Sequence, residues 1–234
     1  MHEINIPAEL LERAKGMRGG RDVVFERVDP AKTALVVVDL QNGFMEEGAP
    51  VEAATAREVV PNVNRIAAAL REAGGLVTYL RYTNDATDPQ PWVWYDDLLG
   101  EGVGDGMRDA FAAGGHFHAL WPDLDVRDED LVIDKTRFSG FTPGCSTLDA
   151  ELRDRGIETL IICGTTTNCC CESTARDANQ MNYNVIFVTD GCAALSDAEH
   201  NAALISMATI FADLQSTDRV LETLAASRVP AAAE

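Results

Sequence analysis

Short runs of consecutive apolar residues recur along the chain, and longer stretches with helical spacing of apolar residues separate them. The runs are rich in Val, Ile and Leu, as expected for strands that are buried on both faces of a sheet. They predict strands over 34–40, 76–82, 130–135, 159–164 and 184–190. The helical spacing predicts helices over 53–74, 145–156, 169–182, 198–213 and 216–226. Alternating strands and helices predict an α/β fold with a parallel sheet and helices on both of its faces.

Residues 83–129 interrupt this alternation. The segment is rich in Gly and Pro and contains all three tryptophans, Trp92, Trp94 and Trp121. A connection of this length in a compact domain usually serves a function, so we expect an inserted lid or pocket wall. The alternative is a small subdomain that packs its own aromatic side chains.

The net charge of −19 argues against nucleic acids and anionic membrane surfaces as partners, because phosphates and acidic headgroups would be repelled. The N-terminal stretch lacks the pattern of a secretory signal, and no apolar run reaches the length of a membrane span. The six cysteines do not form the spaced framework of a disulfide-rich secreted domain. These features predict a cytoplasmic protein with reduced thiols.

Chemically active side chains follow three of the predicted strands. Asp39 comes after the first strand, Lys135 ends the strand at 130–135, and the strand at 159–164 leads into three adjacent cysteines. Ligands of open parallel sheets bind at the carboxyl ends of the strands. Taken singly, an aspartate there is often a cap and a lysine is usually solvated. Their joint placement indicates a nucleophilic site.

The three cysteines, Cys169, Cys170 and Cys171, follow a candidate helix cap, Asn168. A thiol in the first turn of a helix lies near the positive end of the helix dipole, which favours the thiolate. Neighbouring helical residues point about 100° apart, so the three thiols are not expected to face one pocket or to bind one metal ion. The residues alone do not decide which cysteine reacts.

Three motifs resemble those of the isochorismatase-like cysteine hydrolase superfamily, over roughly residues 30 to 226. The superfamily pattern G-x-x-T-x-x-C-x-x-x-T-A matches Gly164, Thr167, Cys170, Thr174 and Ala175. Its aspartate matches Asp39 in VVVDLQNGF, and its lysine matches Lys135 in DKTRFSGF. The register selects Cys170 as the nucleophile, so Cys169 and Cys171 are expected to face elsewhere.

The resemblance implies a doubly wound, three-layer α/β/α domain with a mostly parallel central sheet of about six strands. This hydrolase domain would span 30–234, carry the lid insertion at about 83–129, and follow an N-terminal helical arm over 1–29. The superfamily also implies a homo-oligomer. Whether the arm reaches a neighbouring subunit or packs locally is left open by the sequence.

The resemblance further implies a mechanism of C–N bond hydrolysis. Asp39 would take the thiol proton, Lys135 would stabilise negative charge, and the Cys170 thiolate would attack a carbonyl carbon to form a thioester and release ammonia or an amine. A cis peptide at Thr165–Thr166 would aim the Thr166 N–H, together with the Cys170 N–H, at the oxyanion. Isochorismatases proper lack the nucleophilic cysteine, so Cys170 argues against vinyl ether cleavage.

No metal and no cofactor are expected. Nicotinamidases of this superfamily carry an aspartate-x-histidine metal motif after the second strand, where this chain has RYTNDATDPQPW and no histidine. The chain has an H-x-H pair, His116 and His118, but the segment around it is a loop by composition. We expect these histidines to line the lid, with a pair of metal ligands as the alternative.

The sequence is more similar to ureidoacrylate and N-carbamoyl amide hydrolases than to nicotinamidases, which implies a small amide or ureido substrate. Arg137 is a candidate to bind a substrate carboxylate, with an ion pair to a local acid such as Asp134 as the alternative. Asn84 is a candidate to bind the amide or ureido group. The expected apolar wall consists of Phe44, Trp92, Trp94, Phe138 and Phe141. The alternatives are an amidase for a larger or cyclic amide, and a catalytically idle domain that binds a metabolite or a partner.

Overall fold

The computed structural model describes residues 1–85, 87–88, 92, 97–98 and 102–227. Its centre is a six-stranded sheet in the order β3-β2-β1-β4-β5-β6, and all five strand pairs are parallel. The strands are β1 (Thr33–Val38), β2 (Leu76–Tyr82), β3 (Leu131–Lys135), β4 (Thr159–Thr165), β5 (Asn184–Ala193) and β6 (Asp213–Gln215). The predicted parallel α/β sheet is confirmed.

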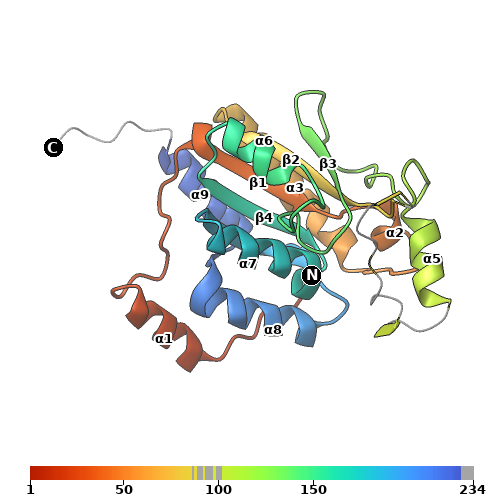
Figure 1. The fold of residues 1–234 in the computed structure, drawn as a ribbon. Helices are drawn as coiled ribbons and strands as arrows, with labels where there is room; N and C mark the ends of the chain where they lie inside the picture. Colours follow the sequence, from red (N-terminus) through yellow and green to blue (C-terminus); the bar gives the residue numbers. More distant parts are fainter. Residues whose placement is uncertain (86, 89–91, 93–96, 99–101, 228–234) are drawn as a thin grey trace.

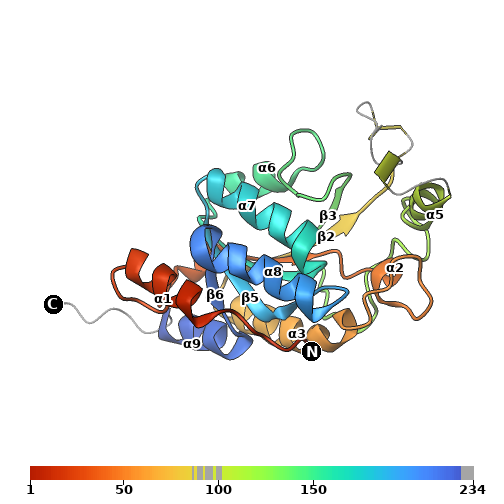
Figure 2. The same ribbon diagram turned by 90° about the horizontal axis from the view of Figure 1, so that it is seen from below.

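Helices cover both faces of the sheet, as Figures 1 and 2 show. One face carries α3 (Ala56–Glu72) and α9 (Thr217–Ser227), and the other carries α6 (Leu148–Asp154), α7 (Glu172–Gln180) and α8 (Asp197–Ser206). The remaining helices are α1 (Ala8–Met17), α2 (Asn42–Met45) and α5 (Val103–Ala110), with a 3-10 turn η1 (Pro30–Lys32) and π-helical turns η2 (Thr167–Cys171) and η3 (Met207–Phe211). Within the described residues, no helix has the length and apolar character needed to cross a membrane.

The central strand β1 explains why its sequence is continuously apolar. Leu35 and Val37 belong to the hydrophobic core under α3 and α9, whereas Val36 and Val38 belong to the core under α6, α7 and α8. Because side chains alternate between the two faces of a strand, a strand between two helical layers needs apolar residues at every position.

The structure adds elements that the hydrophobic pattern did not predict. The short edge strand β6 holds only one apolar residue, Leu214, between Asp213 and Gln215. The stretch predicted as one helix over 198–213 forms α8 and η3, and its last residue, Asp213, is the first residue of β6. Helix α5 lies inside the segment that was predicted as an inserted lid.

The N-terminal segment packs against its own chain. The Arg18 guanidinium donates hydrogen bonds to the carbonyl oxygens of Ala208 and Ala212, and α1 lies beside η3. The backbone N–H groups of Val24 and Phe25 donate to the Asp213 carboxylate. The polar residues of β6 are therefore buried because they hold this segment.

Candidate active site

The strand order changes direction between β1 and β4. The chain leaves β1 toward α2 and α3, and it leaves β4 toward η2 and α7 on the opposite face (Figure 2). Such a switch point opens a crevice at the carboxyl ends of the two strands, and ligands of open α/β sheets bind there. Asp39 follows β1 at this point, and Cys170 lies in η2 after β4.

Lys135 reaches the switch point from the end of β3 by extending its side chain across β2. Its Nζ lies 5.4 Å from the centre of the Tyr82 ring and donates to Asp39 Oδ2 at 2.7 Å. It also donates to the Arg137 carbonyl oxygen at 3.0 Å. Both Asp39 and Lys135 are fully buried, at 0% exposure of their side chains. A buried ion pair of this kind persists only with close geometry and further hydrogen bonds.

Burial and the ion pair both shift the pKa values of Asp39 and Lys135. Burial raises the pKa of Asp39 above its usual value, and the Lys135 ammonium opposes that rise. Burial alone would lower the pKa of Lys135, but the nearby Asp39 carboxylate opposes this effect, and the pKa is raised overall. Lys135 is therefore an ammonium at neutral pH, beside a carboxylate whose proton affinity is higher than that of an exposed aspartate.

Asp39 is placed by an unusual backbone conformation. Its φ of 52° lies in the left-handed region, which few residues other than glycine adopt. The Asp39 N–H donates to the Leu80 carbonyl oxygen at 3.0 Å, so the residue still pairs with β2 while the chain turns. Gln41 then bonds to both the N–H and the carbonyl of Tyr82, which holds the turn against the end of β2.

The Cys170 thiol lies close enough to the Asp39 carboxyl to lower the pKa of that group. Asp39 Oδ1 is buried and has no hydrogen-bond partner among the described residues. A hydrogen bond with Cys169 and burial together raise the pKa of Cys170, against the opposing effect of Lys135. The expectation that the helix start favours a thiolate stays a prediction, because these two effects oppose it while the Lys135 ammonium acts in its favour.

The turn that presents Cys170 depends on Gly164. Its φ is 126°, and a Cβ atom there would lie 2.1 Å from the Val38 carbonyl oxygen, so only glycine fits. The following Thr165–Thr166 peptide is cis, which confirms that expectation. The Thr167 hydroxyl bonds to Nδ1 of the buried His200 at 2.8 Å, which anchors the turn to α8.

Cys169 shares the cavity with Cys170, so the expectation that it faces elsewhere is wrong. The turn is π-helical rather than α-helical, and a wider turn brings consecutive side chains closer in direction. Asn168, expected as the helix cap, also lines the cavity. Cys171 is fully buried and its thiol contacts that of Cys192, as expected for a packing residue.

A cavity of about 290 Å³ lies over Cys170. Apolar and aromatic side chains form most of its wall, and the η2 turn and the start of α8 form the rest. Its lining residues are Phe44, Val51, Tyr82, Met107, Phe138, Thr166, Asn168, Cys169, Cys170, Leu195 and Glu199. This volume suits a small organic molecule bound over the thiol.

Of the predicted apolar wall, Phe44 and Phe138 line the cavity. Trp92 stands behind this wall, with its ring edge-on to Phe138 at a centroid distance of 4.7 Å. Phe141 is buried in the core under α6 and α7. Trp94 lies outside the described residues.

The two polar candidates for substrate binding are engaged elsewhere in the structure. Arg137 pairs with Asp88 at 3.0 Å, and its guanidinium lies 5.2 Å from the centre of the Trp92 ring. The expected local acid, Asp134, pairs instead with Arg81. Asn84 bonds through its side chain to the Arg108 carbonyl oxygen, and it does not line the cavity.

His116 and His118 lie in different environments. The exposed His116 ring contacts Glu46, whereas His118 is buried at 2% exposure and bonds to the Thr83 hydroxyl at 2.7 Å. Desolvation by burial lowers the pKa of His118, which keeps it neutral. In the described part of the chain, no three His, Cys, Asp or Glu side chains are grouped to hold a metal ion.

Sequence reasoning missed Glu199, Cys169 and Gln41 as parts of the site. Glu199 enters the cavity from the first turn of α8, far along the chain from the motifs that were recognised. A signal existed in the S-x-x-E pattern at Ser196, which marks a helix start after β5, at the carboxyl edge of the sheet.

Comparison with known proteins gives consistent matches. A family model described as Isochorismatase domain matches residues 33–219. The uncharacterized isochorismatase family protein YwoC of Bacillus subtilis (strain 168) is 32% identical over 199 residues, which cover 83% of this chain and 95% of that protein. The ureidoacrylate amidohydrolase RutB of Variovorax paradoxus (strain S110) is 32% identical over 207 residues, which cover 82% of this chain and 81% of that protein.

Solved structures agree in fold. A cysteine hydrolase from Pseudomonas syringae pv. phaseolicola superposes with a TM-score of 0.78 at 28% identity, covering 87% of this chain and 97% of that chain. The N-carbamoylsarcosine amidase from Thermoplasma acidophilum superposes with a TM-score of 0.64 at 26% identity, covering 80% of this chain and 97% of that chain.

Proposed function

Since the chain belongs to the isochorismatase family, we propose that it is a metal-independent cysteine hydrolase that cleaves a C–N bond of a small amide, ureido or N-carbamoyl compound. The observation that carries the proposal is the placement of Cys170 in the wall of a cavity, at the switch point where the buried Asp39–Lys135 pair also lies. A ureidoacrylate amidohydrolase and an N-carbamoylsarcosine amidase among the similar proteins support this reaction class.

The first half of the reaction begins with a proton transfer. The Asp39 carboxylate takes the Cys170 proton, which its raised pKa favours, and the sulfur attacks the substrate carbonyl carbon. Lys135 stays protonated and offsets the negative charge that passes from Asp39 to the sulfur. Asp39 then gives its proton to the substrate nitrogen, so ammonia or an amine leaves and a Cys170 thioester remains.

The second half repeats this proton transfer with water. Asp39 takes a proton from a water molecule, which attacks the thioester and releases the acid or carbamate together with the thiol. In both halves we assign the oxyanion to the backbone N–H groups of Thr166 and Cys170, which border the cavity. Losing one such donor typically costs about 3–4 kcal/mol of transition-state stabilisation.

Cys170→Ala tests the proposal by removing the attacking sulfur. Ammonia release is measured with small amides, N-carbamoyl acids, ureidoacrylate and nicotinamide, with and without a chelator. We expect wild-type turnover that resists the chelator and falls by about 10⁴-fold or more in the variant. Cys145→Ala, which removes a thiol that does not line the cavity, is the matched control and should retain activity.

Other outcomes would separate the alternatives. Wild-type turnover that survives in Cys170→Ala would contradict the cysteine mechanism. Loss of turnover with chelator would contradict metal independence. A wild-type protein that forms no acyl-enzyme with any amide, including larger and cyclic amides, would favour the idle binding domain. The cytoplasmic location and the homo-oligomeric state stay predictions of this proposal.

A further inference from the structure

Glu199 carries the charge in the active-site cavity. Apart from the two thiols, it is the only acidic or basic side chain among the described lining residues. It is half-buried and lies in the first turn of α8, and it lines the same cavity as Phe44 and Phe138. A substrate bound over Cys170 therefore meets a carboxylate within the same small volume.

The Glu199 carboxylate is held in place by its own helix. Ser196, the N-cap of α8, donates from its hydroxyl to Glu199 Oε2 at 2.6 Å and accepts from the Glu199 N–H at 3.3 Å. This is an S-x-x-E arrangement at a helix start, in which a glutamate and a glutamine serve almost equally well. The geometry of the cap accounts for the side-chain position, but it does not require the negative charge.

The cations near the cavity are already bound to carboxylates. Lys135 pairs with Asp39 at 2.7 Å, and Arg137 pairs with Asp88 at 3.0 Å and lies over Trp92. Neither of these two side chains is part of the cavity lining. A carboxylate on the substrate would therefore approach Glu199 with no cation of the described lining to offset the repulsion.

The segment between Tyr82 and Met107 also carries negative charge and no positive charge. Both end residues line the cavity, so the segment starts and finishes at the site. Its sequence contains no Lys, Arg or His, and it contains six acidic residues, Asp85, Asp88, Asp96, Asp97, Glu101 and Asp105. Whatever its placement, this segment supplies no cation to bind a substrate anion.

We propose that Glu199 is a specificity residue that selects amides or ureides whose remote group is neutral or cationic and rejects those that carry a carboxylate there. The inference rests on the proposed hydrolase function and narrows its substrate class. It also predicts a difference in specificity from the ureidoacrylate amidohydrolase RutB, since ureidoacrylate carries a carboxylate. Ammonium-bearing amides are the favoured class, because Glu199 would pair with their cation.

The first experiment measures the charge of the cavity without requiring turnover. Iodoacetamide and iodoacetate both transfer a two-carbon group to the Cys170 sulfur with release of iodide, and they differ only in a neutral or anionic end. Alkylation rates at Cys170 are followed by peptide mass spectrometry and normalised to the rates for free cysteine. Glu199→Gln should raise the iodoacetate-to-iodoacetamide rate ratio about tenfold, since two like charges a few ångströms apart repel at intermediate dielectric.

The matched control is Glu158→Gln. It removes the same charge from an exposed residue just before the start of β4, whereas Cys170 lies after the end of that strand. The control should leave the rate ratio unchanged. A ratio that moves equally in both variants, or in neither, would overturn the role of Glu199. Wild-type-like melting of each variant confirms that the comparison is made between folded proteins.

The second experiment measures selectivity for substrates of one length. Butanamide, 3-aminopropanamide and succinamate place a methyl, an ammonium and a carboxylate at the same distance from the amide. In the wild type, kcat/KM should be highest for the ammonium amide and lowest for succinamate, and Glu199→Gln should narrow that range about tenfold or more. Amide turnover without this order would overturn the specificity inference and leave the hydrolase function standing. Charge-selective alkylation without turnover of any amide would contradict the hydrolase function instead.

Discussion

At the scale of single residues, the site contains a buried ion pair in which each charge needs the other as its partner. Asp39 and Lys135 have no exposure to water and bond to each other at 2.7 Å. Removing one partner of such a pair typically costs about 3–5 kcal/mol, because the other charge is left buried and unpaired. A buried pair is in itself weak evidence for stability, which fits the role proposed above for Asp39 as the base.

Cys169→Ala tests how the protein sets the acidity of the nucleophile. The hydrogen bond between the two thiols raises the pKa of Cys170, so its removal should lower that pKa and let the thiolate form at lower pH. The measurement is the pH dependence of iodoacetamide alkylation at Cys170. Cys145→Ala, whose thiol is not in the cavity lining, should leave the profile in place. A profile that moves to higher pH in Cys169→Ala would contradict the assigned role of the thiol pair.

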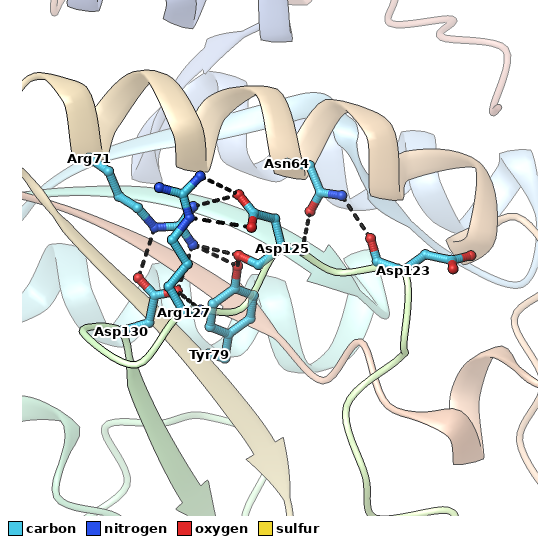
Figure 3. Close-up of polar contacts among 7 residues, drawn as sticks. All are labelled: Asn64, Arg71, Tyr79, Asp123, Asp125, Arg127 and Asp130. Atoms are coloured by element: carbon cyan, nitrogen blue, oxygen red, sulfur yellow. Dashed lines mark hydrogen bonds and ion pairs between the residues drawn. The ribbon is translucent and has the colours of Figure 1, made fainter.

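At the scale of elements, a polar cluster fastens the segment before β3 to α3 (Figure 3). Arg71 of α3 is buried at 8% exposure and bonds to the carboxylates of Asp125 and Asp130. Asn64, earlier in α3, donates to the Asp123 carbonyl oxygen and accepts from the Asp125 N–H. Because β3 starts directly after this segment and ends at Lys135, the cluster positions the strand that carries the buried ammonium.

Arg71→Ala should lower the free energy of unfolding by about 3–5 kcal/mol, because Asp130, at 1% exposure, would lose its buried partner. Urea denaturation at pH 7 measures the change. Arg127→Ala removes a cation from the same cluster, but its side chain is 46% exposed, so its cost should stay below about 1 kcal/mol. Equal costs for the two variants would contradict the role given to burial. The double variant with Asp130→Asn should recover part of the Arg71→Ala loss.

The elements also show what could be predicted from the sequence. Strand β1 was predictable because a strand between two helical layers is apolar at every position, and strand ends then located Asp39 and Lys135. Strand β6 was not, because its Asp213 and Gln215 are buried by contacts to the distant N-terminal segment. Glu199 and Cys169 were missed because their positions depend on where α8 starts and on the π-helical winding of η2.

At the scale of the whole molecule, buried histidines couple stability to pH. His200 bonds to Thr167 beside the nucleophile turn, and its ring stacks on His2 at 4.4 Å. Burial lowers the pKa of His200 from 6.5 to about 4. His118, buried beside Thr83, also has a lowered pKa because of desolvation. Both histidines join distant parts of the chain while they are neutral.

Acidification from pH 7 toward pH 4 should destabilise the protein. Between pH 6.5 and about 4 the unfolded chain binds a proton at His200 and the folded chain does not, so stability is present above pH 6.5 and is lost as the pH falls. Urea midpoints across this range measure the slope, which should be shallower in His200→Gln. The exposed His116→Gln is the control and should follow the wild type. A slope that is unchanged in His200→Gln would contradict this source of acid sensitivity.

The strand order determines when, as the chain folds, Asp39, Lys135 and Cys170 come together. One half of the sheet, β1 to β3, positions Asp39, which follows β1, and Lys135, which ends β3. In the other half, β4 to β6, the turn with Cys170 follows β4. Within the sheet, the two halves meet where β1 pairs with β4, from Thr33 beside Thr159 to Val38 beside Gly164. The first half holds the Asp39–Lys135 ion pair but lacks the Cys170 thiol. Turnover by the proposed mechanism should therefore require that the two halves have joined, because neither half alone holds Asp39, Lys135 and Cys170 together.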